Sequence, residues 1–187
     1  QQQAILAYFL LMFLLRGMPF IDLAHLRKRD MQDGRITYSR HKTDKPITVR
    51  IPREALVLIA KYADRHSASP YLFPILDARI RDSWQSYRNY QDALRHFNRK
   101  LGQVMSRLLP GVRVSSYTAR HTWATLAFHS GQPVGIISQA LGHSSLRVTE
   151  TYLKPFGNEL VDKANRQLIA SVRKCKWKNE TEYRAGL

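Results

Sequence analysis

Residues 2–15, QQAILAYFLLMFLL, constrain the fold of this chain more than any other segment. A helix that is hydrophobic on nearly every side must be buried on most sides, so the rest of the chain has to pack around it. The apolar run 4–15 is about a dozen residues long, short of the roughly 20 needed to span a bilayer, and it lacks the charged start of a signal peptide. We therefore expect a central core helix. Because the sequence opens inside this helical pattern, we also expect a fragment whose N-terminal part is missing.

The remaining periodicity predicts an α+β fold that is mostly helical. Residues 35–39 (RITYS) and 47–51 (ITVRI) alternate apolar with polar side chains and are rich in β-formers, so they are predicted strands. The basic connection 40–46 between them makes a small antiparallel hairpin with a charged tip. Helices are predicted over residues 19–30, 53–65, 83–108 with a softening near Gly102, 117–129, 133–140, 146–153 and 158–173, before a polar tail at 174–187.

Several residues are predicted to end or begin these helices. Asp82 can cap the long helix that follows it, and Ser115 or Ser116 can cap the next one. Gly142 is expected at a helix C-terminus in the left-handed conformation, where glycine has no steric penalty. Asp33-Gly34 is a turn signal directly before the first strand.

The chain is strongly basic. Lysine and arginine number 30 and aspartate and glutamate 14, so the formal net charge is +16, and the isoelectric point is about 10.4. A folded domain with this excess most often meets a polyanion, and nucleic acid is favoured over a ribosomal-type protein or an anionic-membrane binder. A hydrophobic content of 44% argues against a disordered basic protein. The single cysteine, Cys175, excludes an internal disulfide and a Cys-rich zinc site, which favours a reducing cytoplasm.

Three short motifs follow one another in the second half of the chain: YTARHTWAT at 117–125, LGHSS at 141–145 and TETY at 149–152. They resemble the active-site signature of the tyrosine recombinases, or phage-type integrases, in which Arg-His-Thr is followed by Leu-Gly-His and then by a Tyr about nine residues later. The resemblance extends upstream to RGMPFID at 16–22 and HKT at 41–43. It therefore covers most of the chain, in the family's order and spacing.

The resemblance implies the tyrosine recombinase catalytic-domain fold over residues 1–187, without the N-terminal core-binding domain and with 174–187 as a C-terminal tail. Such enzymes cut DNA by attack of a Tyr hydroxyl on a phosphodiester, leaving a 3′-phosphotyrosyl link and a free 5′-hydroxyl. One ester replaces another, so no ATP, cofactor or metal is expected. The carboxylates here are also scattered, unlike the clustered acids of a two-metal nuclease.

The partners implied are double-stranded DNA and other protomers, which assemble on DNA as a tetrameric synapse, whereas the isolated domain is expected to be a monomer. No membrane partner is implied. The implied location is the bacterial cytoplasm, at the nucleoid.

The resemblance also assigns roles to individual residues. Tyr152 is the nucleophile, and because a phenol has a pKa near 10, forming its phenolate at pH 7 costs about 4 kcal/mol that nearby cations must offset. Arg120 clamps the phosphoryl oxygens through its guanidinium, and His143 contacts the same group. Lys42 protonates the leaving 5′-oxygen, with Lys45 as its rival. Each residue has a structural alternative: ring packing for the Tyr, a turn hydrogen bond for the His, and a surface charge or ion pair for the cations.

Two positions depart from the family pattern. The family commonly has a His three residues before the second Arg, and this chain has Tyr117, which can donate a hydrogen bond but is a poor proton acceptor. Aligning Asp22 and Asp30 with the family's acidic positions places Pro19 where the first catalytic Arg should stand. Our hypothesis is that Arg16, or another Arg brought in by the fold, supplies the missing guanidinium. The alternative is that Arg16 is a helix-end cation or a DNA-backbone contact. Similar departures are familiar in integrases of mobile elements from Bacteroides-like bacteria.

His121 directly follows Arg120 in the first motif. Neighbouring residues on a helix point to different sides. We therefore expect His121 to face another side of the helix than Arg120 and assign it a structural role.

Three functions fit these residues. The first is a site-specific DNA recombinase, or integrase, acting through its catalytic domain. The second is a type IB topoisomerase, which shares the tyrosine mechanism but relaxes DNA as a monomer. The third is a basic DNA-binding accessory module whose catalytic set has decayed. Strand exchange between two sites separates the first from the second, and covalent attachment to DNA separates both from the third.

Overall fold

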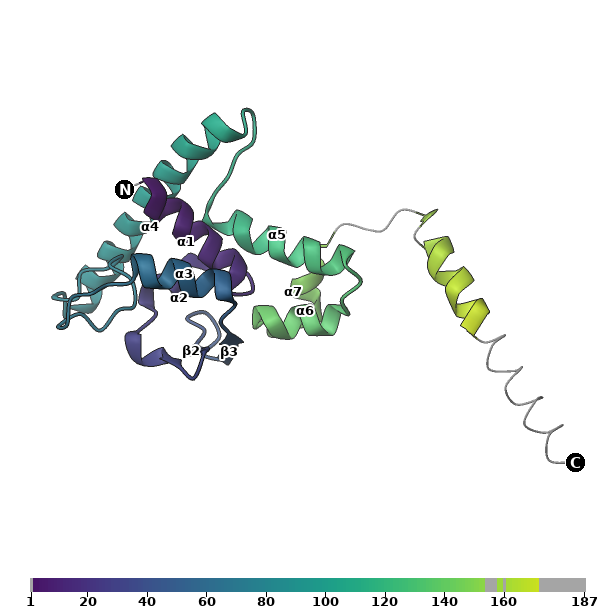
Figure 1. Cartoon of the computed structure of the whole chain (residues 1–187), viewed down its shortest axis with the longest axis horizontal. Coiled ribbons are helices and arrows are strands. Elements are labelled where there is room, and N and C mark those ends of the chain that lie inside the picture. The colour runs from purple at the N-terminus through teal and green to yellow at the C-terminus, as the bar shows by residue number, and fades with distance from the viewer. Residues whose placement is uncertain (1, 154–157, 160, 172–187) are drawn as a thin grey trace, which may run out of the picture. The chain divides into compact units, whose positions relative to one another are not determined.

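The computed structural model of this chain describes residues 2–153, 158, 159 and 161–171, which fall into two units, Gln1–Leu153 and Lys154–Leu187. The elements of the first unit are α1 (Gln2–Leu14), α2 (Phe20–His25), the 3-10 turn η1 (Lys28–Asp30), β1 (Met31–Gln32), β2 (Arg35–Ser39), β3 (Pro46–Arg50), α3 (Arg53–Tyr62), α4 (Ser83–Leu108), α5 (Ser116–His129), α6 (Val134–Leu141) and α7 (Leu146–Glu150) (Figure 1). Among the described helices, none combines the length and the apolarity that a membrane crossing requires.

The second unit contains the predicted last helix. Residues 158, 159 and 161–171 are helical, which confirms this part of the prediction over 158–173. Every described side chain of this helix is exposed. The predicted helix stop at Lys154-Pro155 and the predicted tail at 174–187 lie outside the described residues.

The helix α1 is the element around which the first unit is built. It packs against α2, α3, α4 and α5, and Figure 1 shows it in the middle of this unit. Leu11 and Met12 are fully buried, whereas Leu10 forms the exposed edge of the helix. The predicted central core helix is therefore confirmed.

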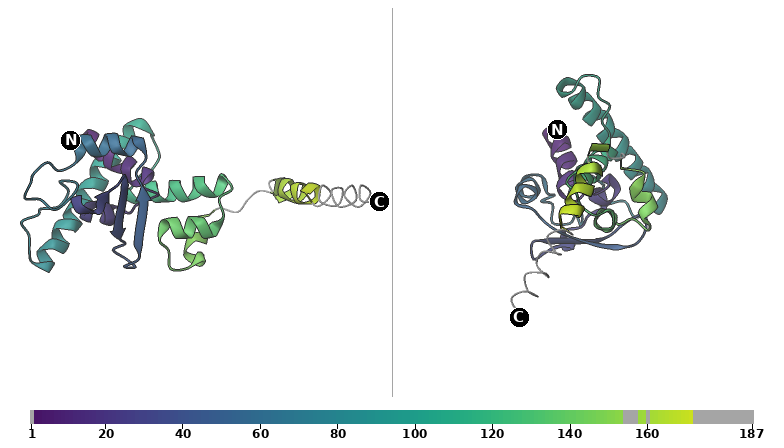
Figure 2. Two further views of the ribbon diagram at one scale, coloured as in Figure 1. Left: turned by 60° about the horizontal axis from the view of Figure 1, so that its bottom comes forward. Right: turned by 90° about the vertical axis from the view of Figure 1, so that its right-hand side faces the viewer.

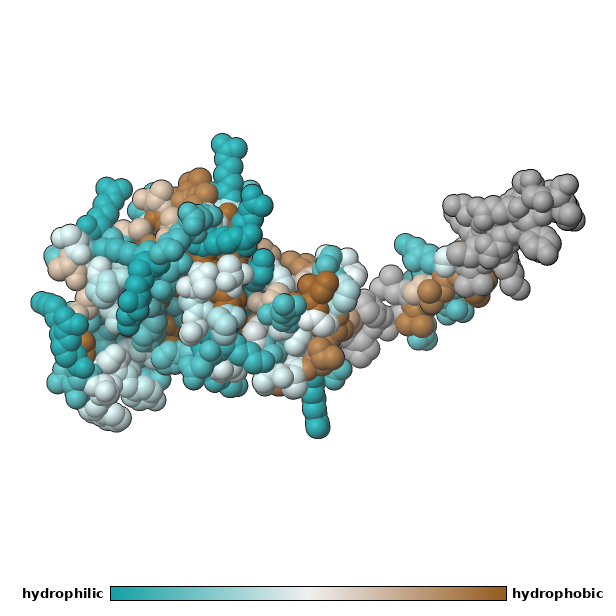
Figure 3. All heavy atoms as spheres, turned by 90° about the horizontal axis from the view of Figure 1, so that it is seen from below, coloured by the Kyte–Doolittle hydropathy of each residue, from teal (hydrophilic) through white to brown (hydrophobic). Residues whose placement is uncertain are grey.

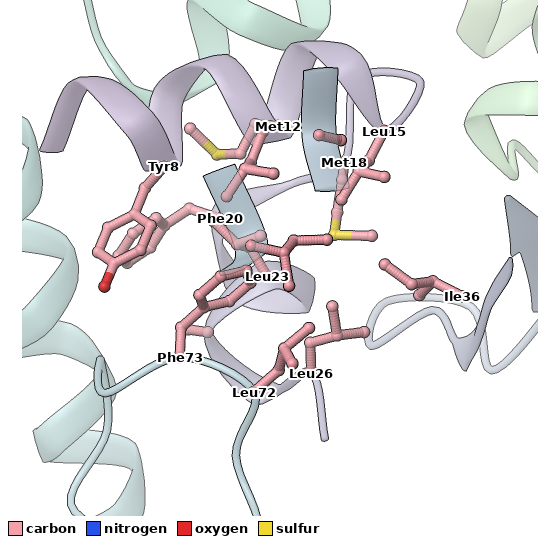
Figure 4. Close-up of a cluster of buried hydrophobic side chains, with 14 of the residues drawn as sticks. Tyr8, Met12, Leu15, Met18, Phe20, Leu23, Leu26, Ile36, Leu72 and Phe73 are labelled. Carbon is pink, nitrogen blue, oxygen red and sulfur yellow. The ribbon is translucent and has the colours of Figure 1, made fainter. Parts of the chain in front are cut away.

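The main hydrophobic core joins α1 to the elements that cover it. Figure 4 shows Tyr8 and Met12 of α1, Leu15 and Met18 after it, Phe20 and Leu23 of α2, Leu26, Ile36 of β2, and Leu72 and Phe73 of the loop after α3. Complete burial of one such side chain contributes about 1.5–3 kcal/mol to folding. This core fixes the end of α1 and the start of α2, where the RGMPFID motif lies.

The sheet has three antiparallel strands in the order β1-β2-β3, and it lies along one side of the helices (Figure 2). In its register Ile36 is opposite Val49, and both side chains are buried while their neighbours along each strand are exposed. Asp33 and Gly34 both have positive φ, 49° and 69°, as the two-residue turn between β1 and β2 requires. The two predicted strands and the Asp33-Gly34 turn are confirmed.

The prediction that the second helix extends to residue 30 is wrong. Helix α2 ends at His25, because Arg27 then pairs with Tyr71 in an antiparallel bridge. The backbone N–H of Leu72 also donates to the carbonyl of Leu26 at 2.7 Å. The loop after α3 therefore forms hydrogen bonds with backbone groups after α2 that a longer helix would have paired internally. The chain then continues into η1 and β1.

The predicted helix ends are largely confirmed. The Asp82 carboxylate accepts a hydrogen bond from a backbone N–H of α4, and the Ser115 hydroxyl does the same for α5. Gly142 ends α6 with φ +65°, in the left-handed region. The expected softening near Gly102 is wrong, since α4 is continuous through it. One glycine costs a helix only about 1 kcal/mol, which the packing of a long amphipathic helix offsets.

Polar residues dominate the face of the first unit that is seen from below in Figure 3. Apolar side chains gather on this face over the helices α5–α7. Leu126, Ile136 and Leu146 of these helices are each about half exposed.

Candidate active site

A cavity of about 330 Å³ lies where five distant parts of the chain meet. The side chains around it come from α2, the β2–β3 loop, α4, the start of α5 and the segment from the α6–α7 turn to the residues after α7. They include Asp22, Arg40, Lys42, Tyr90, Tyr117, His143 and Tyr152. Four of the six predicted site residues therefore line one cavity, and Arg120 joins them through a hydrogen bond.

Arg120 lies beneath this cavity, with only 2% of its surface exposed. Its guanidinium donates to the carbonyl of Gly17 at 2.8 Å and to the carbonyl of Leu141 at 2.6 Å, and it lies 2.9 Å from the His143 Nε2. Burial lowers the pKa of Arg120, and the nearby charge of Arg40 lowers it further. An arginine pKa starts above 12, so the group stays charged at neutral pH. Arg120 thus brings a fixed cation to the site.

Glycine is required where the chain passes Arg120. Gly17 has φ +66°, and a Cβ atom there would lie 3.1 Å from the Arg120 Cα. The Arg16-Gly17 pair of the RGMPFID motif therefore lets the chain after α1 pack closely against α5.

His143 is held in one tautomer. Arginine has no acceptor, so the His143 Nε2 accepts from Arg120, and the ring proton sits on Nδ1. Nδ1–H donates to the Thr149 hydroxyl at 2.8 Å. Burial lowers the pKa of His143 to about 4, and the charges of Arg120, Arg40 and Lys42 act in the same direction. His143 is therefore a neutral imidazole at pH 7, fixed on both ring nitrogens.

Tyr152 lies just beyond α7, which ends at Glu150 rather than continuing through residue 153 as predicted. Its ring packs against the small buried cluster of Ala124, Ile137 and Leu141. Its hydroxyl is hydrogen-bonded to the hydroxyl of Tyr117. The side chain is half-buried, so its hydroxyl is held at the cavity and is not sealed in the interior.

Tyr117 is in the first turn of α5, next to the same hydroxyl. Burial raises the pKa of Tyr117, and its hydrogen bond to Tyr152 raises it further. Tyr117 is therefore a protonated phenol at neutral pH, able to donate a hydrogen bond.

Arg40 lies in the cavity although sequence patterns alone do not single it out. It is 6% exposed, its Nη1 donates to the carbonyl of Gly142 at 2.8 Å, and its Nε is 4.0 Å from a carboxylate oxygen of Asp22. Asp22 also accepts from the backbone N–H of His41 at 2.9 Å. Burial raises the pKa of Asp22, whereas the His41 N–H and the Arg40 charge lower it. The carboxylate thus anchors the start of the hairpin loop to α2.

One sequence signal could have indicated Arg40. An acidic residue on a largely apolar helix, such as Asp22, needs a partner when it is buried. Arg40 directly follows β2 and is one of the cations near the start of the basic connection. Thr149, which fixes His143, has no comparable signal.

The two lysines of the hairpin loop differ in their environment. Lys42 is exposed and lines the cavity. The Lys45 ammonium donates to the backbone carbonyl of His143 at 3.4 Å and thereby ties the loop to the α6–α7 turn. Of the two lysines, Lys42 is the one that lines the cavity.

The structure does not bring Arg16 to this cavity. Its Nη1 donates to the carbonyl of Thr48 on β3 at 3.5 Å. It lines a separate cavity of about 630 Å³ together with Ile47 and Trp123. Arg16 has a positive φ of 61° and forms part of the turn after α1.

His121 lies beside Tyr117 and Tyr152, a position that sequence patterns do not indicate. The centre of its ring is 4.5 Å from that of Tyr152 and 5.0 Å from that of Tyr117. The reason is that Tyr152, which follows α7, reaches the face of α5 that carries residues 117 and 121.

Metal ligands do not gather at the site. Over the described residues, no group of three or more His, Cys, Asp or Glu side chains is arranged to hold a metal ion.

Comparison with known proteins places this geometry in a family. Residues 1–159 match the phage integrase family. The tyrosine recombinase XerA of Pyrococcus furiosus is 29% identical over 155 residues, which cover 80% of this chain and 51% of that protein. XerA of Thermococcus kodakarensis is 29% identical over 140 residues, covering 74% and 46%. The chain spans about half the length of these curated relatives, and it belongs to the phage integrase family.

Solved structures agree on the fold. A crystal structure of XerA recombinase has a TM-score of 0.56 at 17% identity, covering 89% of this chain and 62% of that one. The XerH site-specific recombinase bound to its difH substrate, in a pre-cleavage complex, has a TM-score of 0.60 at 16% identity, covering 88% and 46%. The predicted fold class is therefore confirmed: a mostly helical tyrosine recombinase catalytic-domain fold with a small antiparallel sheet.

The protonation of His143 predicts how stability depends on pH. Its pKa is about 4 in the folded protein and about 6.5 when unfolded, so the unfolded chain binds one more proton between these values. The free energy of unfolding should therefore fall as the pH drops from about 6.5 towards about 4, and this contribution should be constant above that range. Urea unfolding at about pH 5 and about pH 7.5 measures it.

The matched variants are His143→Gln and His66→Gln, since His66 is exposed on a loop. His143→Gln should weaken the pH dependence, and His66→Gln should leave it unchanged. Equal pH dependence in His143→Gln and the native protein would contradict the buried, neutral imidazole.

Proposed function

We propose that this chain is the catalytic part of a site-specific DNA recombinase that cuts and rejoins strands through a 3′-phosphotyrosyl link to Tyr152. The observation that carries the proposal is the meeting of a half-buried phenol with Arg120, His143 and Lys42 at one cavity. Membership of the phage integrase family supports it, as do relatives that are named tyrosine recombinases.

The phosphate would be held by Arg40 and Arg120, while His143, which accepts a hydrogen bond from Arg120, keeps that guanidinium in place. Both guanidinium groups have a buried Nε–H with no hydrogen-bond partner in the described part of the chain. Negative charge builds on the phosphoryl oxygens during transfer, and guanidinium groups are well suited to receive it. Arg40 thus supplies the guanidinium that is absent at Pro19, entering from the hairpin loop.

The strand-cleavage step needs only groups at this cavity. The Tyr152 oxygen forms a bond to phosphorus as the bond to the 5′-oxygen breaks. Lys42 gives a proton to that oxygen, and the phenol proton leaves to water at the open side of the cavity. Tyr117 donates a hydrogen bond to a phosphoryl oxygen once the phosphate replaces its contact with Tyr152.

The proposal also includes the binding partners of the protein and its cellular location. The substrate is duplex DNA, gripped through its phosphates by the basic surface, and other protomers join on the DNA to form a tetrameric synapse. Mobile-element integration or excision is the biological setting, at the nucleoid in the cytoplasm of the host cell. The presence of Arg40 favours an active enzyme over a decayed binding module.

The first test asks whether Tyr152 becomes linked to DNA. Incubation with a nicked suicide substrate that carries the element's own recombination site should give a covalent protein–DNA adduct on a denaturing gel. Tyr152→Phe should give none, because no hydroxyl remains to attack. The control Tyr87→Phe removes an exposed hydroxyl on α4, outside the cavity, and should behave as the native protein. An adduct formed by Tyr152→Phe would contradict the proposal, and relaxation without exchange between two sites would favour a topoisomerase.

The second test compares two arginines. Arg40→Ala should slow adduct formation by about 100- to 1,000-fold, the usual loss for one preorganised donor to a transition state. Arg16→Ala should change the rate by no more than a few-fold, since Arg16 lies at another cavity. Thermal unfolding and DNA binding of both variants confirm that they fold. A large loss in Arg16→Ala with a near-native rate in Arg40→Ala would reverse the assignment.

A further inference from the structure

Three rings form a closed cluster at the cavity, which we call the ring trio: Tyr117, His121 and Tyr152. Tyr117 and His121 are four residues apart on α5 and so share one face of the helix. The Tyr152 ring lies 4.5 Å from the His121 ring at 37°, and 6.1 Å from the Tyr117 ring at 34°. The third pair, Tyr117 and His121, is 5.0 Å apart at 68°. Each ring of the trio therefore contacts the other two.

Tyr152 depends on such contacts because it is not part of a regular helix. It follows the end of α7, and its backbone N–H donates to the carbonyl of Thr149 at 3.0 Å. The His143 ring stacks on it at 5.3 Å and is itself fixed by hydrogen bonds. The His121 ring is closer to Tyr152 than the His143 ring is, and it comes from a different helix. Misplacing a reacting group by about 1 Å can cost about 100-fold in rate, so this support bears on catalysis.

We propose that His121 is a positioning residue that orients the Tyr152 phenol for attack, an inference that rests on the proposed function. The two rings are tilted by 37° with their centres 4.5 Å apart. The Tyr152 hydroxyl is hydrogen-bonded to Tyr117, and no hydrogen bond joins it to His121 in the described part of the chain. His121 thus acts through packing, and proton transfer is not its role.

The surroundings of His121 separate this role from a contribution to folding. The residue is exposed, and its side chain has no hydrogen-bond partner among the residues that the structure describes. It also lies outside both buried hydrophobic clusters. Replacing an exposed side chain of this kind changes stability little. A loss of cleavage in His121 variants would therefore report on the geometry of the nucleophile.

The test is single-turnover adduct formation on two suicide substrates. One carries the normal phosphodiester, and the other has sulfur in place of the leaving 5′-oxygen, which removes the need for a proton from Lys42. His121→Ala and His121→Gln should slow adduct formation about 10- to 100-fold on both substrates, with unchanged DNA affinity and melting temperature. His121→Phe, which keeps a ring, should stay within a few-fold of the native rate. The control His66→Ala removes an exposed imidazole on a loop outside the cavity and should have no effect.

Three outcomes would overturn the inference. Native rates in His121→Ala, with no adduct in Tyr152→Phe, would reject the positioning role and leave the recombinase proposal intact. A defect that the sulfur substrate corrects, as it should for Lys42→Ala, would show proton transfer to the leaving group instead. A loss in His121→Phe as large as in His121→Ala would show that the imidazole itself is needed. An adduct formed by Tyr152→Phe would sink the recombinase proposal itself.

Discussion

The buried guanidinium of Arg120 is the interaction on which the site depends. Burying an unpaired charge costs several kcal/mol, and hydrogen bonds to a charged group return about 1.5–3 kcal/mol each. Arg120 offsets its burial by bonding the carbonyls of Gly17 and Leu141, so it links the end of α1 to the end of α6. Its third contact is with the His143 Nε2, so the ring proton of His143 is on Nδ1 and is donated to Thr149. One side chain therefore sets the packing of two helices and the tautomer of the imidazole at the cavity.

The hairpin loop is joined to this centre by a second set of contacts. Arg40 reaches both Asp22 on α2 and the carbonyl of Gly142 at the end of α6. Gly142 has φ +65°, and a Cβ atom there would lie 2.5 Å from the Ile47 side chain and 3.1 Å from that of Arg40, so glycine favours the close approach of the hairpin to this turn. The same approach brings Lys42 to the cavity. Arg40 and Lys42 thus share one loop that packs against one glycine.

Local patterns in the sequence predict most of the fold, because strand alternation, helix periodicity and caps act over a few residues. The end of α2 and the strand β1 escape them, since the pairing of Arg27 with Tyr71 joins residues far apart in sequence. The residues of the candidate site likewise differ in whether the sequence or only the fold identifies them. The motif residues are identified by their resemblance to a family, whereas Arg40 emerges only when the fold places it beside Asp22. The contact of His121 with Tyr152 is not predicted, because helix geometry alone does not show that Tyr152 packs against α5.

The account holds that a phenol oxygen and two guanidinium groups meet at one phosphorus atom. Vanadate, which adopts the geometry of the phosphoryl-transfer transition state, tests this most directly. In a crystal structure with vanadate and DNA strands flanking a cleavage site, vanadium should be bonded to the Tyr152 oxygen. Arg40 and Arg120 should contact its equatorial oxygens. Vanadium away from Tyr152, or bound by Arg16 while Arg40 stays on its backbone carbonyl, would contradict the account.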